Sequence, residues 1–242
     1  MSSFAYRLSE STRPAMGLIV LRVDETIEED FRRYVAPEEA RLHVTRVQSG
    51  DDLTPDSIAG MEAELTSAAS LFPPAVDFAV VGYACTSGTA QLGADTVRAR
   101  VAAGATTRHV TNPLTAALAA FDDLGLGRVG IVSPYVASVA EPLRRAFVAQ
   151  GITVPRMLSF GEQVESRVAR IDPHSIAEAA HALAGDGNMD AVFLSCTNLR
   201  TYGILPQLQA QLGLPVLSSN QVLAWHMMRL AGVSSTQCRL TF

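Results

Sequence analysis

The chain alternates short apolar runs with longer stretches in which apolar residues recur at helical spacing. Several runs, such as 78–84 and 129–132, contain almost no strongly polar position. Continuous apolar runs are typical of parallel strands that are covered on both faces. The predicted strands are 16–23, 41–47, 78–84, 108–111, 129–133, 153–160, 191–195 and 215–218.

Helical patterns fill the intervals between these runs. Thr54-Pro55 and Asp172-Pro173 each combine an N-cap residue with proline at the first helical position. The regular alternation of strand and helix predicts an α/β protein with a parallel, doubly wound architecture. The predicted helices are 54–71, 89–104, 113–124, 136–150, 173–185, 201–213 and 220–231.

One sequence pattern occurs twice in the chain. Residues 77–86 and 190–197 each consist of an acid, an apolar strand and a Cys-Thr pair, and the two cysteines are 111 residues apart. This repeat predicts two similar half-domains with a seam near 112–114 and a C-terminal helix that returns to the first half. The predicted first half is 1–112 plus 221–242 and carries Cys85, and the predicted second half is 113–220 and carries Cys196.

Cys85 and Cys196 are both expected at the carboxyl end of a strand, where open α/β sheets bind ligands. Each is followed by hydroxyl and amide side chains and then by a predicted helix, whose N-terminus is expected to lower the pKa of the thiol. Two facing thiols suit acid–base chemistry, in which one removes a proton and the other delivers one from the opposite face. One thiolate could instead add to an activated double bond, let it rotate and leave. Buried, inert cysteines are the alternative that the matching contexts argue against.

Composition narrows the class of protein. The 242 residues carry a net charge of −5 without a basic run, which argues against a nucleic-acid binder. Three cysteines without a visible signal peptide argue for a reducing, cytoplasmic environment. No apolar stretch approaches the roughly 20 residues of a membrane span. The spacing of Cys and His predicts no zinc site, and Cys238 lacks the context of the other two cysteines.

The chain resembles the aspartate/glutamate racemase superfamily, in its maleate isomerase and arylmalonate decarboxylase branch. The resemblance implies two Rossmann-like halves related by a pseudo-twofold axis, an active site in the cleft between them, and no cofactor. Arylmalonate decarboxylases of this branch keep only the second cysteine, so a chain with both looks like the isomerases and racemases. The matching segments are Gly17–Val20 with Glu28, Tyr83–Thr89, Val129–Tyr135, Val168–Ile171 and Ser195–Asn198.

The resemblance also implies roles for individual residues. Cys85 and Cys196 match the catalytic pair, and Tyr135 matches a tyrosine that contacts the substrate. The hydroxyl and amide groups beside the two cysteines match the donors that hold a substrate carboxylate. These donors are Thr86, Ser87, Thr197 and Asn198.

Two positions depart from the maleate isomerase pattern, because Asp24 and Glu165 stand where those enzymes carry asparagine. An ionised acid accepts hydrogen bonds and repels a carboxylate, so a substrate with an ammonium or amidinium group is favoured. Residues 21–28 and 218–226 look most like the racemase-like proteins of ectoine utilisation, and ectoine is a cyclic amidine carboxylate. Both acids could instead be solvated loop residues, an interpretation that fits Glu165 better than Asp24.

The sequence therefore predicts a cofactor-independent racemase or epimerase that acts beside a carboxylate on an amino-acid-like or ectoine-related substrate. Maleate cis–trans isomerisation, through addition of a cysteine to the double bond, is the close alternative. Decarboxylation of a malonate, for which Cys85 would be dispensable, and non-catalytic binding of a small molecule stay open. Analogy with the fold suggests a homodimer, and no nucleic-acid or membrane partner is expected.

Overall fold

The structure is a computed structural model that describes residues 4–9, 11–52, 54–185, 187–235 and 238–240. Strands and helices alternate along nearly the whole chain. The strands are β1 (Ala15–Leu21), β2 (Arg41–Val47), β3 (Phe78–Ala84), β4 (Val110–Thr111), β5 (Val129–Tyr135), β6 (Met157–Glu162), β7 (Ala191–Leu194) and β8 (Val216–Ser218). The helices are α1 (Ile27–Tyr34), α2 (Pro55–Ser70), α3 (Thr86–Leu92), α4 (Ala94–Gly104), α5 (Pro113–Asp123), α6 (Ala137–Ala149), α7 (Glu165–Val168), α8 (Pro173–Ala184), α9 (Leu205–Leu212) and α10 (Ser219–Leu230).

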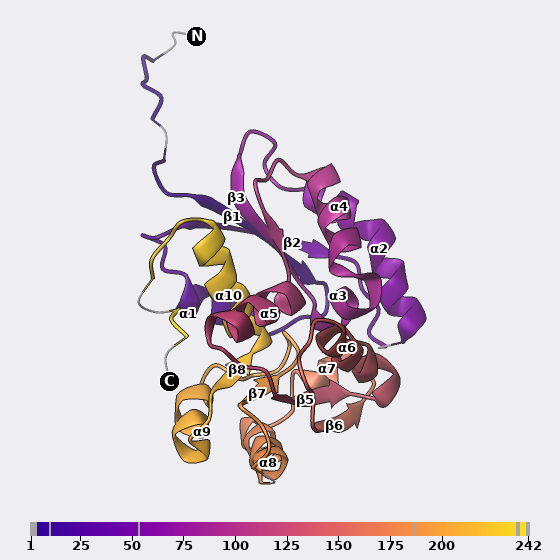
Figure 1. The fold of residues 1–242 in the computed structure, drawn as a ribbon. Coiled ribbons are helices and arrows are strands. Elements are labelled where there is room, and N and C mark those ends of the chain that lie inside the picture. Colours follow the sequence, from indigo (N-terminus) through magenta and orange to yellow (C-terminus); the bar gives the residue numbers. More distant parts are fainter. Residues whose placement is uncertain (1–3, 10, 53, 186, 236–237, 241–242) are drawn as a thin grey trace.

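The strands in the described part of the chain form two four-stranded parallel sheets with the same strand order. The first sheet runs β2-β1-β3-β4 and the second runs β6-β5-β7-β8. Figure 1 shows the first sheet above the second, with helices around both. The predicted α/β class with two similar parallel halves is confirmed.

The central strands are covered on both faces, as their apolar runs predict. All seven positions of β1, β3 and β5 are buried. In β1, Met16 and Leu18 belong to an apolar cluster with Phe31 of α1, whereas Ile19 belongs to a second cluster with Leu65 of α2. Alternate residues of a strand point to opposite faces, so each sheet is the middle layer between two layers of helices.

The last helix crosses from one half to the other. It follows β8 of the second sheet, yet Met227 of α10 packs against the first sheet. A Cβ at Gly82 of β3 would lie 2.5 Å from the sulfur of Met227, so glycine is what lets α10 approach this strand. This packing agrees with the predicted return of the C-terminal helix, although the domain boundaries themselves remain a prediction.

Several predicted elements differ from the structure. The helix expected at 89–104 is two helices, α3 and α4, because Gly93 between them adopts a φ of +88°. The helix expected from residue 201 begins at Leu205, and α1 and α7 were not predicted. Strand β6 begins at Met157 rather than at 153, since Pro155 has no N–H to donate to a neighbouring strand.

Candidate active site

The two strand ends that carry Cys85 and Cys196 meet at the contact between the halves. The hydroxyl of Thr197 donates to the carbonyl of Ala84 at 3.2 Å. The hydroxyl of Thr86 donates to Oγ of Ser219 at 2.8 Å, and the same oxygen accepts the N–H of Cys196 at 3.0 Å. Ser219 thus binds the loop after Cys85, and the carbonyl of Ala84 binds the loop after Cys196.

Cys85 caps helix α3 with its side chain. Its Sγ accepts the N–H of Gly88 at 3.2 Å and lies 3.8 Å from Oγ of Ser87. A Cβ at Gly88 would lie 2.8 Å from this sulfur and 2.8 Å from the hydroxyl of Tyr83. The glycine therefore makes room for the thiol, which the sequence analysis did not anticipate.

Cys196 has a strained backbone. Its φ is +137°, and among the non-glycine residues of the described chain Cys196 is the one with a positive φ. Such a conformation costs of the order of 1–3 kcal/mol and persists where neighbouring groups impose it. Here Ser219 binds the N–H of Cys196, and the N–H of Asn198 donates to its Sγ at 3.2 Å.

Beside Cys196 lies a hydrogen-bonded chain of buried side chains. The hydroxyl of Tyr135 is 2.7 Å from Sγ of Cys196 and donates to Oε1 of Glu165 at 3.0 Å. Nδ2 of Asn198 donates to Oε2 of Glu165 at 3.0 Å, and its Oδ1 accepts the N–H of Glu25 at 2.9 Å. Glu165 is only 2% exposed, so its interpretation as a solvated loop acid is wrong.

Asp24 is also buried, at 4% exposure. Its Oδ1 accepts the N–H groups of Thr26 at 2.8 Å and Ile27 at 2.9 Å, which fixes the start of α1. Its Oδ2 has no partner at hydrogen-bond geometry among the described residues, although the hydroxyl of Thr197 lies close enough to lower the pKa of Asp24. A solvated role for Asp24 is likewise wrong, and a buried oxygen without a partner is a point at which a ligand could bind.

Burial governs the ionisation of the thiols. It raises the pKa of Cys85 to about 11 and that of Cys196 well above the usual range of a thiol, and the nearby Glu165 adds to both. The expected lowering by helix N-termini is therefore wrong for this structure. Helix α3 has only seven residues, and α9 begins at Leu205, well beyond Cys196. Each thiol is 3% exposed, so desolvation outweighs the few donors around it.

The two acids are shifted in the same direction. Burial raises the pKa of Glu165 to about 7, against the hydrogen bonds from Asn198 and Tyr135 that lower it. Burial likewise raises the pKa of Asp24 above its usual value, and the N–H groups of Ile27 and Thr26 oppose this shift. Both acids therefore hold a proton more readily than an exposed carboxyl does.

The structure brings all the predicted site residues to this one buried region. The hydroxyls of Thr86 and Thr197 are engaged with protein groups rather than free for a carboxylate. Sequence reasoning missed Ser219 as the hydroxyl that joins the two cysteine loops. A signal was present, because Ser219 follows an apolar strand much as Cys85 follows β3.

A second buried pair that was not predicted supports the loop after Cys196. Nδ2 of Asn220 donates to Oδ2 of Asp30 at 2.8 Å and to the carbonyl of Thr197 at 2.9 Å. Burial raises the pKa of Asp30 to about 6. Asp30 and Asn220 thus tie α1 and α10 to the second cysteine loop.

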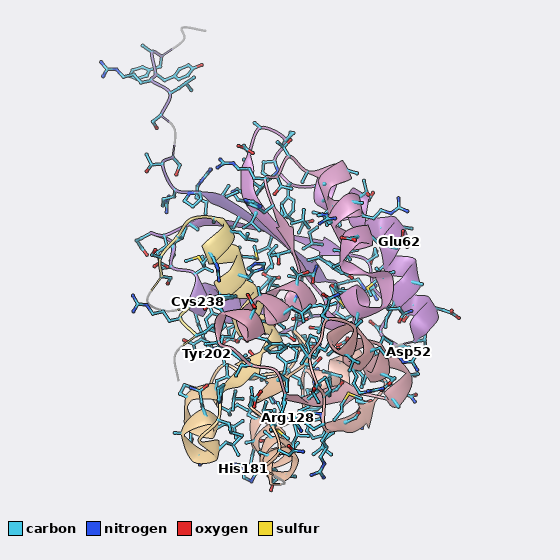
Figure 2. All side chains as sticks on the ribbon, viewed as in Figure 1. Asp52, Glu62, Arg128, His181, Tyr202 and Cys238 are labelled. Atoms are coloured by element: carbon cyan, nitrogen blue, oxygen red, sulfur yellow. The ribbon has the colours of Figure 1, made fainter. Side chains whose placement is uncertain are left out.

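Three further polar residues, Asn112, His226 and Cys238, lie outside this network. Asn112 caps α5 through the N–H of Thr115 at 2.8 Å, and His226 pairs with the hydroxyl of Thr111 at 2.8 Å. The sulfur of Cys238 lies 3.8 Å from the carbonyl of Gln221, beside α10 (Figure 2). Among the described residues no group of three or more His, Cys, Asp or Glu side chains is arranged to hold a metal ion. No helix of the described chain is long and apolar enough to cross a membrane.

Comparison with known proteins identifies relatives. The chain is 33% identical over 124 residues to arylmalonate decarboxylase of Bordetella bronchiseptica, which covers 50% of this chain and 51% of that protein. It is 27% identical over 114 residues to maleate isomerase of Alcaligenes faecalis, which covers 47% of this chain and 45% of that protein. The matched region thus spans about half the length of these curated relatives.

The fold is shared over a much larger part of the chain. The crystal structure of maleate isomerase Iso from Pseudomonas putida S16 superposes with a TM-score of 0.80 at 23% identity and covers 92% of this chain and 98% of that one. The sequence profile of the arylmalonate decarboxylase family matches residues 89–240. The chain therefore belongs to the arylmalonate decarboxylase family.

Proposed function

We propose that this protein is a cofactor-independent isomerase that uses Cys85 and Cys196 on opposite faces of one substrate carbon. The observation that carries the proposal is the contact between the loops that hold two buried thiols, which follow β3 and β7, the third strands of their sheets, and are joined through Ser219. One thiolate takes the proton from the carbon beside a carboxylate, and the other thiol returns a proton from the opposite side. The product is the racemised or epimerised substrate.

Donors around the thiols stabilise the charge that develops on the carboxylate. Thr86, Ser87 and Thr197 are proposed to hold this group, with Tyr135 as a further donor. The hydroxyls of Thr86 and Thr197 exchange their present partners for the substrate when it enters. Because both thiols are 3% exposed, entry requires the two cysteine loops to move apart.

The substrate is proposed to carry a cationic group beside its carboxylate. Oδ2 of Asp24 is buried without a partner in the described chain, and an ammonium or amidinium N–H would satisfy it. The same cation would lower the pKa of Asp24 and keep it ionised. An amino acid, an acylated amino acid or an ectoine-like cyclic amidine has the required pair of groups, and the resemblance to ectoine-utilisation proteins supports the last of these.

Maleate cis–trans isomerisation is the second candidate, and the maleate isomerase relatives favour it. In that reaction one cysteine adds to the double bond, the new single bond rotates, and the cysteine leaves. The raised pKa of Asp24 fits this reaction as well, because a protonated carboxyl donates a hydrogen bond to a carboxylate as asparagine does. Decarboxylation of a malonate, as in the Bordetella relative, is the third candidate.

Solvent exchange tests the proposal. The protein is incubated in D₂O with D- and L-amino acids, their N-acetyl derivatives, ectoine, hydroxyectoine, maleate and an arylmalonate, and NMR follows each compound. Deuterium uptake beside a carboxylate with inversion supports the racemase or epimerase. Conversion of maleate to fumarate, or release of CO₂ from the malonate, would replace it with the second or third candidate. A silent panel together with slow alkylation of both thiols would argue for a binding protein.

A further inference from the structure

The hydroxyl of Tyr135 lies between a thiol and a carboxyl group and has a single proton to share. It donates to Oε1 of Glu165 at 3.0 Å, while its oxygen lies 2.7 Å from Sγ of Cys196. When the proton of Tyr135 points to Glu165, the hydrogen of the short contact with sulfur must come from the S–H of Cys196. The three groups then form one directed chain, from the thiol through the phenol to the carboxylate.

The far end of this chain is held in place. Asn198 donates to Oε2 of Glu165 at 3.0 Å and to its carbonyl at 3.2 Å. The N–H of Glu25 binds Oδ1 of Asn198 at 2.9 Å, which fixes the orientation of the amide. Glu165 therefore receives two side-chain donors, which favour its ionised form, the state that can accept a proton.

We propose that Glu165 is the base that deprotonates Cys196, with Tyr135 as the proton relay between them. The S–H bond of Cys196 breaks as a new O–H bond forms on Tyr135. The original O–H bond of Tyr135 breaks as one forms on Oε1 of Glu165. One negative charge moves from the carboxylate to the sulfur, Tyr135 is neutral before and after, and the reverse transfer restores the thiol. The inference rests on the proposed acid–base role of Cys196 and assigns Glu165 to that step rather than to substrate binding.

The electrostatics of the site place the shared negative charge on Glu165 at rest, because its pKa of about 7 lies below that of Cys196, so the thiolate is the minor form of the pair. The titratable groups that face Glu165 are Tyr135 of β5, Asp24 of the loop after β1, and the two thiols. The charge of Glu165 raises the pKa of Cys196, so this pair favours one shared negative charge over two. Among the described residues Cys85 has no acid linked to it in this way, since its sulfur contacts Ser87, the N–H of Gly88 and the hydroxyl of Tyr83. The base thus serves one thiol of the pair.

Alkylation of the thiols tests the relay without any knowledge of the substrate. Wild-type protein, Glu165→Gln and Tyr135→Phe are treated with iodoacetamide between pH 5 and 9, and mass spectrometry measures the rate at each cysteine. In the wild type the rate at Cys196 should rise about tenfold per pH unit and level off above the pKa of Glu165, about 7, before it rises again. Glu165→Gln should lose the plateau and show one continuous rise. Tyr135→Phe should keep a plateau of lower height, because the thiolate of Cys196 loses the hydroxyl that stabilises it. Tyr83→Phe, beside Cys85, is the matched control and should leave the Cys196 profile unchanged.

The test compares the shape of the pH–rate profile at Cys196 rather than absolute rates. Removal of the Glu165 charge also lowers the pKa of Cys196 and so changes the rates themselves. A plateau that survives in Glu165→Gln, or a wild-type profile without one, would overturn the relay. A plateau of unchanged height in Tyr135→Phe would overturn the role of Tyr135. Solvent exchange into the substrate is measured in parallel, so that the relay and the proposed function can fail separately. Circular dichroism verifies that each variant is folded.

Discussion

The hydroxyl of Tyr135 lies 2.7 Å from Sγ of Cys196, whereas the described contacts of Cys85 include no comparable link to an acid. The two sheets have the same strand order, yet the two thiols have different surroundings. Cys85 caps a short helix, and Cys196 sits on a strained backbone beside Tyr135 and Glu165. This asymmetry suits the proposed mechanism, in which one thiol acts as the base and the other as the acid.

Replacement of either thiol should abolish isomerisation. Cys85→Ala and Cys196→Ala are each expected to lower kcat by at least about a hundredfold, the usual contribution of a group that transfers a proton. Cys238→Ala is the control, because this cysteine lies beside α10 and outside the network. Steady-state kinetics with the substrate found in D₂O provide the measurement. Unchanged turnover in Cys85→Ala would remove the two-thiol mechanism and favour a decarboxylase-like one.

Gly88→Ala should displace the first thiol. The new Cβ would lie 2.8 Å from Sγ of Cys85, closer than real Cβ contacts allow. Overpacking of this kind costs about 1–3 kcal/mol, and a misplaced reacting group is expected to lower kcat by about a hundredfold. Gly60→Ala of α2 is the matched control, since no atom lies within 4 Å of its Cβ. Normal kinetics in Gly88→Ala would show that the position of Cys85 does not limit turnover.

The backbone of Cys196 predicts an unusual order of stability. Alanine keeps the strain of a φ of +137°, whereas glycine adopts positive φ readily. Cys196→Gly should therefore be more stable than Cys196→Ala by about 1 kcal/mol, in contrast to the usual preference for alanine. Chemical denaturation of the two variants measures the difference. If the alanine variant is the more stable one, the conformation at this residue is not strained.

Glu165 should make the protein less stable as pH rises. Burial raises its pKa from 4.5 to about 7, so the folded protein binds the proton more tightly than the unfolded chain. This contribution is fully present below pH 4.5 and is lost as pH increases through about 7. It corresponds to about 3 kcal/mol at most.

Glu165→Gln should therefore flatten the profile of unfolding free energy between pH 4.5 and 8. Asp30, with a pKa of about 6, contributes in the same direction, so some slope should remain. Denaturant titrations of wild type and variant across this range measure the slopes. Equal slopes would mean that Glu165 titrates as an exposed carboxyl does. Loss of the Asn198 hydrogen bond in the variant changes the unfolding free energy by the same amount at every pH, so the slopes can still be compared.

Asp24→Asn should discriminate the two substrate classes. The amide oxygen of asparagine can still accept the N–H groups of Thr26 and Ile27, so α1 should keep its start. The new amide nitrogen takes the place of Oδ2. Its N–H groups repel a cation and donate hydrogen bonds to a carboxylate. KM for a cationic substrate should rise at least about tenfold, whereas turnover of maleate should be unchanged or improved. An unchanged KM for every cationic compound, together with unimpaired turnover of maleate, would favour the maleate isomerase alternative.

Much of the fold follows from local patterns in the sequence. The bounds of β2 and β3 match the predicted strands. Those of β3 follow from its apolar run, because a strand buried on both faces needs apolar side chains at every position, whereas β2 carries polar side chains and is only partly buried. Helix α1 was not predicted, because it has only eight residues and many of them are acidic or basic. The acid that binds its first N–H groups, Asp24, also lies three positions before the helix, where it does not look like an N-cap residue. The two-half architecture was visible because each half repeats the strand and Cys-Thr pattern.

The residues of the site could be predicted more readily than their burial and the direction of their pKa shifts. Both cysteines could be named from their places at the ends of predicted strands, and Tyr135 and Asp24 from the family resemblance. The burial of Glu165 depends on Tyr135 and Asn198, which are distant in the sequence, so its role was underestimated. The direction of the thiol pKa shifts was wrong for the same reason, since desolvation is set by the packing of two halves and not by the residues next to a cysteine.

The most direct test of the two-thiol account is the stereochemistry of early solvent exchange in D₂O. A single enantiomer of the active substrate is incubated with wild-type protein, and the two enantiomers are separated before a tenth of the material has reacted. The account predicts deuterium beside the carboxylate in the inverted product and protium in the remaining substrate, because different thiols act on the two faces. Deuterium in the remaining substrate with no inverted product would contradict it and would indicate that one group removes and returns the proton on the same face.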